Sequence, residues 1–146
     1  MRWPVCRTMS WAKASLEDVR TAILRQHSQL QQLVDELEAY ANQVIAGAEV
    51  ESRLRDAVRI LRTRFLRHLA FEEAKLVPLL RRIPARDSDA AALIVEHSEQ
   101  REQVDGLLHD VTVFGDPPTF ARAALAFVHV LRRDMTAEEL WLRGIA

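Results

Sequence analysis

Apolar residues recur every three or four positions along four long stretches of this chain, which is the period of amphipathic helices. The predicted helices cover about residues 15–45, 50–82, 90–115 and 117–144. Helices of this length that are joined by short loops lie antiparallel to their sequence neighbours. The pattern therefore predicts an all-α fold, an up-down-up-down antiparallel four-helix bundle over residues 15–146, with residues 1–14 as an N-terminal arm.

The boundaries carry recognisable start and stop signals. Ser15 is suited to the N-cap position, and the acidic residues Glu17 and Asp18 fall in the first turn of the helix. Ile83 precedes a proline, and a residue in that place disfavours the helical conformation, so the second helix is expected to end there. Pro117 is expected in the first turn of the fourth helix.

Each predicted helix has one apolar face directed at the core. The expected core residues are Leu16, Val19, Ile23, Leu30, Val34, Leu37, Ala41 and Val44 in the first helix, Leu54, Val58, Leu61, Phe65, Leu76 and Leu79 in the second, Ala90, Ile94, Val104 and Leu108 in the third, and Phe120, Ala124, Phe127, Leu131 and Trp141 or Leu142 in the fourth. Polar residues interrupt these faces at His27, His68, Glu72, His97, Arg101, Asp134 and Glu138.

Glu72 lies at the centre of the apolar face of its helix, one turn after His68. An unpaired buried carboxylate destabilises a fold by several kcal/mol or more, so Glu72 requires a metal ion or a buried basic side chain. His27 and His68 are each about 20 residues from the loop between their helices and therefore lie level, and His97 and Asp134 are likewise level with each other. Three imidazoles and three carboxylates in one layer predict a site for two iron or manganese ions.

The fourth helix allows two choices of ligand. Asp134 and Glu138 point inward, whereas helical geometry places His129 on the solvated face. Asp134 and Glu138 are therefore preferred as ligands and His129 is the alternative, which a π-bulge in this helix would favour. Glu73 and Glu139 are expected either in solvent or in support of the ligands.

The order of these residues resembles the hemerythrin-like (HHE cation-binding) proteins. The resemblance rests on His27, on His68-x-x-x-Glu72 followed by Glu73-x-x-Leu76-x-Pro78, on Glu96-His97-x-x-x-Arg101 and on an acidic pair before the C-terminus, and it extends over residues 15–143. It implies a non-haem iron centre, usually of two irons, held by His27, His68, Glu72, His97, Asp134 and Glu138. It also implies a role in oxygen or nitric oxide binding, redox response or iron sensing; manganese or zinc would suit similar ligands.

One departure from the family pattern bears on function. Oxygen-carrying hemerythrins have a second histidine four residues after the ligand of the third helix, and this chain has Arg101 there. The difference argues against reversible oxygen transport. Where metal is bound, Arg101 would support a carboxylate or balance the charge of an anion or a reduced oxygen species such as peroxide.

Two other functions remain open at this stage. A di-iron peroxidase or oxidase is one alternative, although a binding or sensing protein is favoured over an enzyme. The other is a metal-free interaction bundle, in which Arg101 forms salt bridges with Glu72, Asp134 or Glu138.

The composition of the chain excludes some classes of binding partner and some cellular locations. The net charge of −1, with interspersed signs, provides no basic face for nucleic acid. The single cysteine, Cys6, cannot form an internal disulfide, and the first ten residues lack the apolar region of a signal peptide. No apolar run approaches the roughly 18 residues that span a bilayer. A cytoplasmic protein without membrane or nucleic-acid partners is expected.

Overall fold

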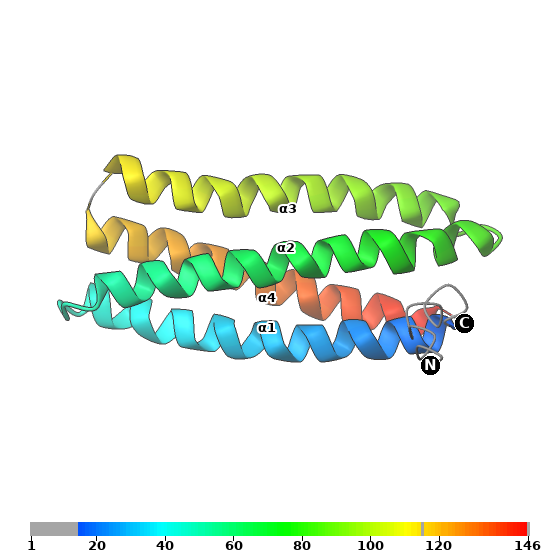
Figure 1. Cartoon of the computed structure of the whole chain (residues 1–146), viewed down its shortest axis with the longest axis horizontal. Coiled ribbons are helices and arrows are strands. Elements are labelled where there is room, and N and C mark those ends of the chain that lie inside the picture. Colours follow the sequence, from blue (N-terminus) through cyan, green and yellow to red (C-terminus); the bar gives the residue numbers. More distant parts are fainter. Residues whose placement is uncertain (1–14, 115, 146) are drawn as a thin grey trace, which may run out of the picture.

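The computed structural model describes residues 15–114 and 116–145, without the side chains of residues 110–114. Its helices are α1 (Leu16–Ile45), α2 (Glu51–Arg82), α3 (Asp87–Phe114) and α4 (Pro117–Gly144). Successive helices run in opposite directions in Figure 1, so the predicted four-helix bundle is confirmed. The predicted N-terminal arm, residues 1–14, lies outside the described residues.

The helix ends follow from local chemistry. Ser15 caps α1: its hydroxyl accepts a hydrogen bond from the Asp18 backbone N–H, and the Asp18 carboxylate accepts one from the Ser15 backbone N–H. Gly47, in the turn after α1, has a φ of 94°, a conformation that favours glycine. The helix α2 ends at Arg82, directly before the Ile83-Pro84 pair, as the sequence predicts.

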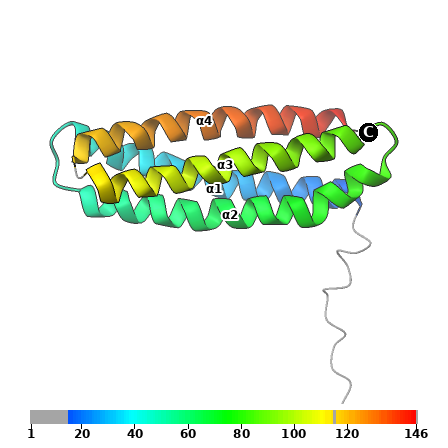
Figure 2. The ribbon, with the colours of Figure 1, turned by 90° about the horizontal axis from the view of Figure 1, so that it is seen from above.

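The four helices form a closed ring in which α1 packs against α2 and α4, and α3 packs against the same two helices. Figures 1 and 2 show this arrangement from two perpendicular directions. The core is divided into two apolar clusters. The larger includes Leu37, Phe65 and Phe127, and the smaller, towards the end of the bundle that holds the α2–α3 loop, includes Ile23 and Leu76.

Buried polar residues separate the two clusters along the bundle axis. His27, His68, Glu72 and His97 are each no more than 5% exposed. His27, Glu72 and His97 lie in sequence between members of the two clusters, and His68 is adjacent to Leu69 of the larger one. We call these residues, together with the mostly buried Glu138, the polar layer. In the described part of the chain, no helix is long and apolar enough to cross a membrane.

The buried face of α3 differs from the expected one. Leu93, Gln100 and Leu107 are buried in addition to Ala90, His97 and Val104, whereas Ile94 is 38% exposed. Leu108 is half-buried and Arg101 is 36% exposed at its side chain. The helix is therefore rotated by part of a turn from its predicted orientation. This rotation buries the neutral amide of Gln100 in place of the Arg101 guanidinium and so avoids the cost of desolvating a charge.

Candidate metal centre

Three helices bring four metal-binding side chains together in the polar layer. His27 of α1, His68 and Glu72 of α2 and Glu138 of α4 each offer a ligand atom, and these atoms lie within 4.8 Å of one another. The Nε2 atom of His27 is 3.0 Å from Glu138 Oε1 and 3.2 Å from His68 Nε2. The Nε2 atom of His68 also contacts Glu72 Oε1. Two imidazole nitrogens and two carboxylates thus converge on one point.

The outer nitrogens of these imidazoles are held by other side chains. His27 Nδ1 lies 3.2 Å from Glu139 Oε1, and His68 Nδ1 lies 2.7 Å from Gln26 Oε1. Both partners are acceptors, so each Nδ1 donates its proton to them. In a neutral imidazole, a proton on Nδ1 leaves a lone pair on Nε2, and this tautomer can bind a metal through Nε2.

A third histidine reaches the same carboxylate from α3. His97 Nε2 lies 3.6 Å from Glu72 Oε2, on the other oxygen from the one that meets His68. Its Nδ1 donates to Glu73 Oε1 at 3.1 Å, and Arg101 holds both oxygens of Glu73 at 2.7 and 2.8 Å. Glu72 is therefore positioned between two groups of ligands.

The pKa values of the layer reflect crowded charges. The pKa of Glu72 is lowered to about 2, because His68 and His97 outweigh the burial that would raise it. Burial raises the pKa of Glu138 to about 7; His27 opposes this rise and the charge of Glu72 adds to it. Burial would lower the pKa values of His27 and His97, but the carboxylates beside them raise both. Glu138 thus takes up a proton near neutrality, where a metal ion would compete with it.

The residues present fit a cation in the centre of the layer. Both oxygens of Glu72, Glu138 Oε1 and His97 Nε2 are buried and have no hydrogen bond of normal geometry within the described part of the chain. Buried polar atoms almost always have a partner, and leaving one without costs about 1–3 kcal/mol. A metal ion bound by these atoms would remove that cost.

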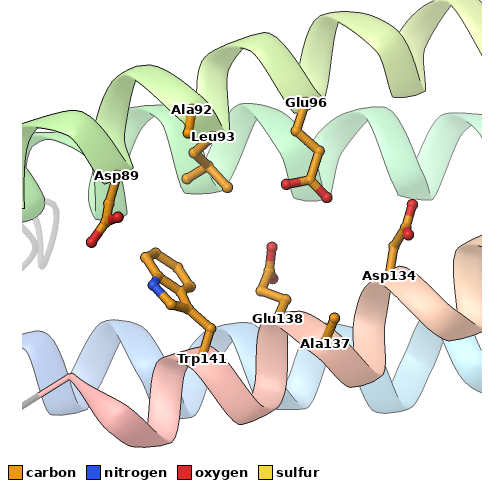
Figure 3. A pocket seen from close by; sticks show the side chains of 8 residues that line it. All are labelled: Asp89, Ala92, Leu93, Glu96, Asp134, Ala137, Glu138 and Trp141. Atoms are coloured by element: carbon orange, nitrogen blue, oxygen red, sulfur yellow. The ribbon is translucent and has the colours of Figure 1, made fainter.

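A groove between α3 and α4 leads from the surface to this centre. It has a volume of about 260 Å³, and four carboxylates line it: Asp89, Glu96, Asp134 and Glu138. Figure 3 shows Glu96 and Glu138 directed into the same space from opposite helices. Burial, and then the charge of Asp134, raise the pKa of Glu96. The groove is an acidic path by which a cation can reach Glu138.

The remaining predicted residues occupy less central positions. Asp134 is 22% exposed and lies 3.4 Å from Gln100 Nε2, at the groove rather than in the four-residue cluster. His129 is exposed. The metal-free alternative requires Arg101 to pair with Glu72, Asp134 or Glu138, but its described ion pair is with Glu73, because α3 is rotated.

Sequence reasoning missed three residues of the site. Gln26 was not predicted as a site residue, and neither was Gln100, which lies between Glu96 and Asp134. Glu96 is exposed, and its place in the lining of the groove was not predicted. The Glu96-His97 pair of the family pattern was the one signal for Glu96. Nothing in the spacing indicated that Gln26 would reach His68 on another helix.

A buried layer of imidazoles and carboxylates in a helical bundle, with an acidic groove beside it, is the kind of site that can hold a metal cation. Residues 18–145 match the model of the hemerythrin HHE cation binding domain, and the chain belongs to this family. No match was found among curated proteins or among solved structures.

Proposed function

We propose that this protein binds non-haem iron in its polar layer and acts in the response to oxygen, nitric oxide, redox state or iron, rather than in oxygen transport. Mixed imidazole and carboxylate ligands suit iron, and also manganese and zinc. The iron would supply the chemistry towards oxygen, nitric oxide or peroxide, while the chain provides the ligands, their orientation and the access path.

The observation that carries the proposal is the orientation of His27 and His68. Their Nε2 atoms are 3.2 Å apart, while both Nδ1 protons are used by side-chain acceptors. A hydrogen bond between the two Nε2 atoms would require one imidazole to be positively charged. With both rings neutral, two lone pairs face each other beside Glu72 and Glu138, an arrangement that a cation between them would stabilise.

The first ion would be held by His27, His68, Glu72 and Glu138. Glu72, His97 and Asp134 would hold a second ion. Glu73 would fix the ring of His97, and Arg101 would fix Glu73. The second position has fewer close ligands than the first, so we expect it to bind metal more weakly.

Metal analysis of the purified protein tests this proposal. Protein expressed in iron-supplemented medium is expected to hold one to two irons per chain, with absorption typical of imidazole- and carboxylate-bound iron. A preparation that stays free of iron, and that takes up neither ferrous iron nor manganese on titration, would refute it. A metal-free interaction bundle, with Arg101 paired to Glu73, would then be the better description.

The acidic groove favours a second candidate function, a di-iron peroxidase or oxidase. Because the groove reaches Glu138, a small molecule such as hydrogen peroxide has access to the centre. Continuous consumption of peroxide by iron-loaded protein, lost in Glu72→Gln, would establish this activity. Stable binding of nitric oxide or oxygen without peroxide turnover would favour the sensing function.

A further inference from the structure

A second groove lies between α1 and α2, which run side by side in Figures 1 and 2. Its volume of about 440 Å³ falls in the range of pockets that bind small molecules. His68 and Gln26 are among its lining residues, so it adjoins the outer, Nδ1 side of a proposed metal ligand. None of the lining residues belongs to the acidic groove between α3 and α4.

The charge of this groove is positive. Arg64 and Arg67 line it, and its lining includes neither aspartate nor glutamate. Other arginines, such as Arg62 and Arg132, form ion pairs with carboxylates, whereas Arg64 and Arg67 form none with the described residues. The N-terminal residues 1–14 contain no acidic residue that could neutralise them. Two adjacent guanidinium groups in a concave site favour an anionic ligand.

The groove has a polar end and an end where apolar side chains lie beside Gln29 and Gln32. Gln26 Oε1 accepts the His68 Nδ1 proton, and no described hydrogen bond uses Gln26 Nε2, so this amide retains donors for a ligand. Leu33 and the 51% exposed Ile60 line the other end. Ile60 and His68 are eight positions apart on α2, which corresponds to about 12 Å along the helix.

We propose that this groove binds a small organic carboxylate. Arg67, Arg64 and Gln26 would hold the carboxylate group, and the hydrocarbon part would lie against Leu33 and Ile60. A guanidinium matches a carboxylate through two parallel hydrogen bonds, which fixes the head group. The apolar end distinguishes an organic acid from an inorganic anion, because only the organic acid gains by covering Ile60.

Gln26 connects this ligand to the metal centre, an extension that rests on the proposed metal binding. A carboxylate that accepts a hydrogen bond from Gln26 Nε2 polarises the amide and strengthens the bond that Oε1 accepts from His68 Nδ1. Where a metal is bound, His68 would thereby be a stronger electron donor to it. By linkage, the acid and the metal must increase each other's affinity by the same factor.

Calorimetric titration of the metal-free protein with hexanoate tests the groove independently of the metal. One binding site is expected, and Arg64→Gln/Arg67→Gln should weaken hexanoate binding at least tenfold. The matched control is Arg53→Gln/Arg81→Gln, which removes two exposed charges from α2 away from the groove and should change the affinity less than twofold. Absence of hexanoate binding, or equal affinity in both double variants, would overturn the proposal.

Two further probes decide the ligand class. Hexanol should bind at least tenfold more weakly than hexanoate, and inorganic phosphate should not displace hexanoate at equal concentration. Tighter binding of phosphate would overturn the organic-acid assignment.

Saturating hexanoate should then raise the affinity for Mn²⁺ at least threefold, and Gln26→Leu should abolish this increase. An unchanged Mn²⁺ affinity in a protein that binds both ligands would refute the coupling.

Discussion

Replacing Glu72 by glutamine should remove most of the stabilisation of this protein by metal. Glu72 is fully buried, and its two oxygens lie between His68 on one side and His97 on the other. Glutamine has nearly the same shape but no charge, so the packing of the layer is retained while the central anionic ligand is lost. The difference between metal-loaded and metal-free protein therefore isolates the role of the charge.

The magnitude follows from linkage. A metal at 100 times its dissociation constant stabilises the folded state by about 2.7 kcal/mol. For a chain near 150 residues, this corresponds to a rise in Tm of about 8 °C, at about 3 °C per kcal/mol. Loss of a supporting residue alone weakens metal binding by about 10–100-fold, so loss of the ligand Glu72 should weaken it at least 100-fold. The same metal concentration would then add only about 0.4 kcal/mol, or roughly 1 °C.

The assay is thermal unfolding by circular dichroism with chelator, with Mn²⁺ and, under anaerobic conditions, with ferrous iron. His129→Ala is the matched control, because His129 lies on the exposed face of α4 and should leave the rise in Tm unchanged. If Glu72→Gln kept the full metal-dependent rise, the assignment of the centre would be wrong. If His129→Ala lost the rise, the ligands proposed on α4 would be wrong.

Three further results are expected. Between pH 6 and pH 8 the metal-free protein should lose stability, because the raised pKa values of Glu138, His27 and His97 stabilise the fold at low pH and this contribution is lost as pH rises through them. The Mn²⁺ affinity measured by calorimetry should rise at least tenfold over the same interval, and an Mn²⁺ affinity that does not change with pH would contradict the competition between protons and metal. Glu73→Gln should weaken binding of the second metal ion by about 10–100-fold in a titration, whereas Glu99→Gln, at an exposed residue, should not. An equal loss of metal affinity in the two variants would show that Glu73 does not position His97. Glu96→Gln should slow metal uptake in stopped-flow measurements and reduce the salt dependence of the uptake rate, with little change in the equilibrium affinity for metal. An unchanged uptake rate would exclude the acidic groove as the path by which metal enters.

The sequence predicts the bundle and its helix ends because those features depend on local signals. Ser15 caps a helix through atoms three residues away, and Ile83 ends one through the adjacent proline. His27 and His68 could be placed level with each other because both are counted from one short loop at a fixed rise per residue.

The rotation of α3 was not predictable in this way. Leu93 and Ile94 are adjacent and similarly apolar, as are Leu107 and Leu108, so periodicity alone supports either face. The choice depends on whether Gln100 or Arg101 enters the core, and the cost of burying a guanidinium decides it. The Gln26 and Glu139 contacts depend on side-chain reach between helices, which a single sequence does not encode in its spacing.

The position of the polar layer between two apolar clusters also restricts how the chain can fold. Apolar faces with a repeat of seven residues can match their neighbours after a shift of one repeat, about 10 Å along the axis. Such a shift of α2 would place Glu72 among the apolar side chains of one of the two clusters and separate it from His97. The residues that prepare the metal centre therefore also select one alignment of the helices and exclude the shifted alternatives during folding.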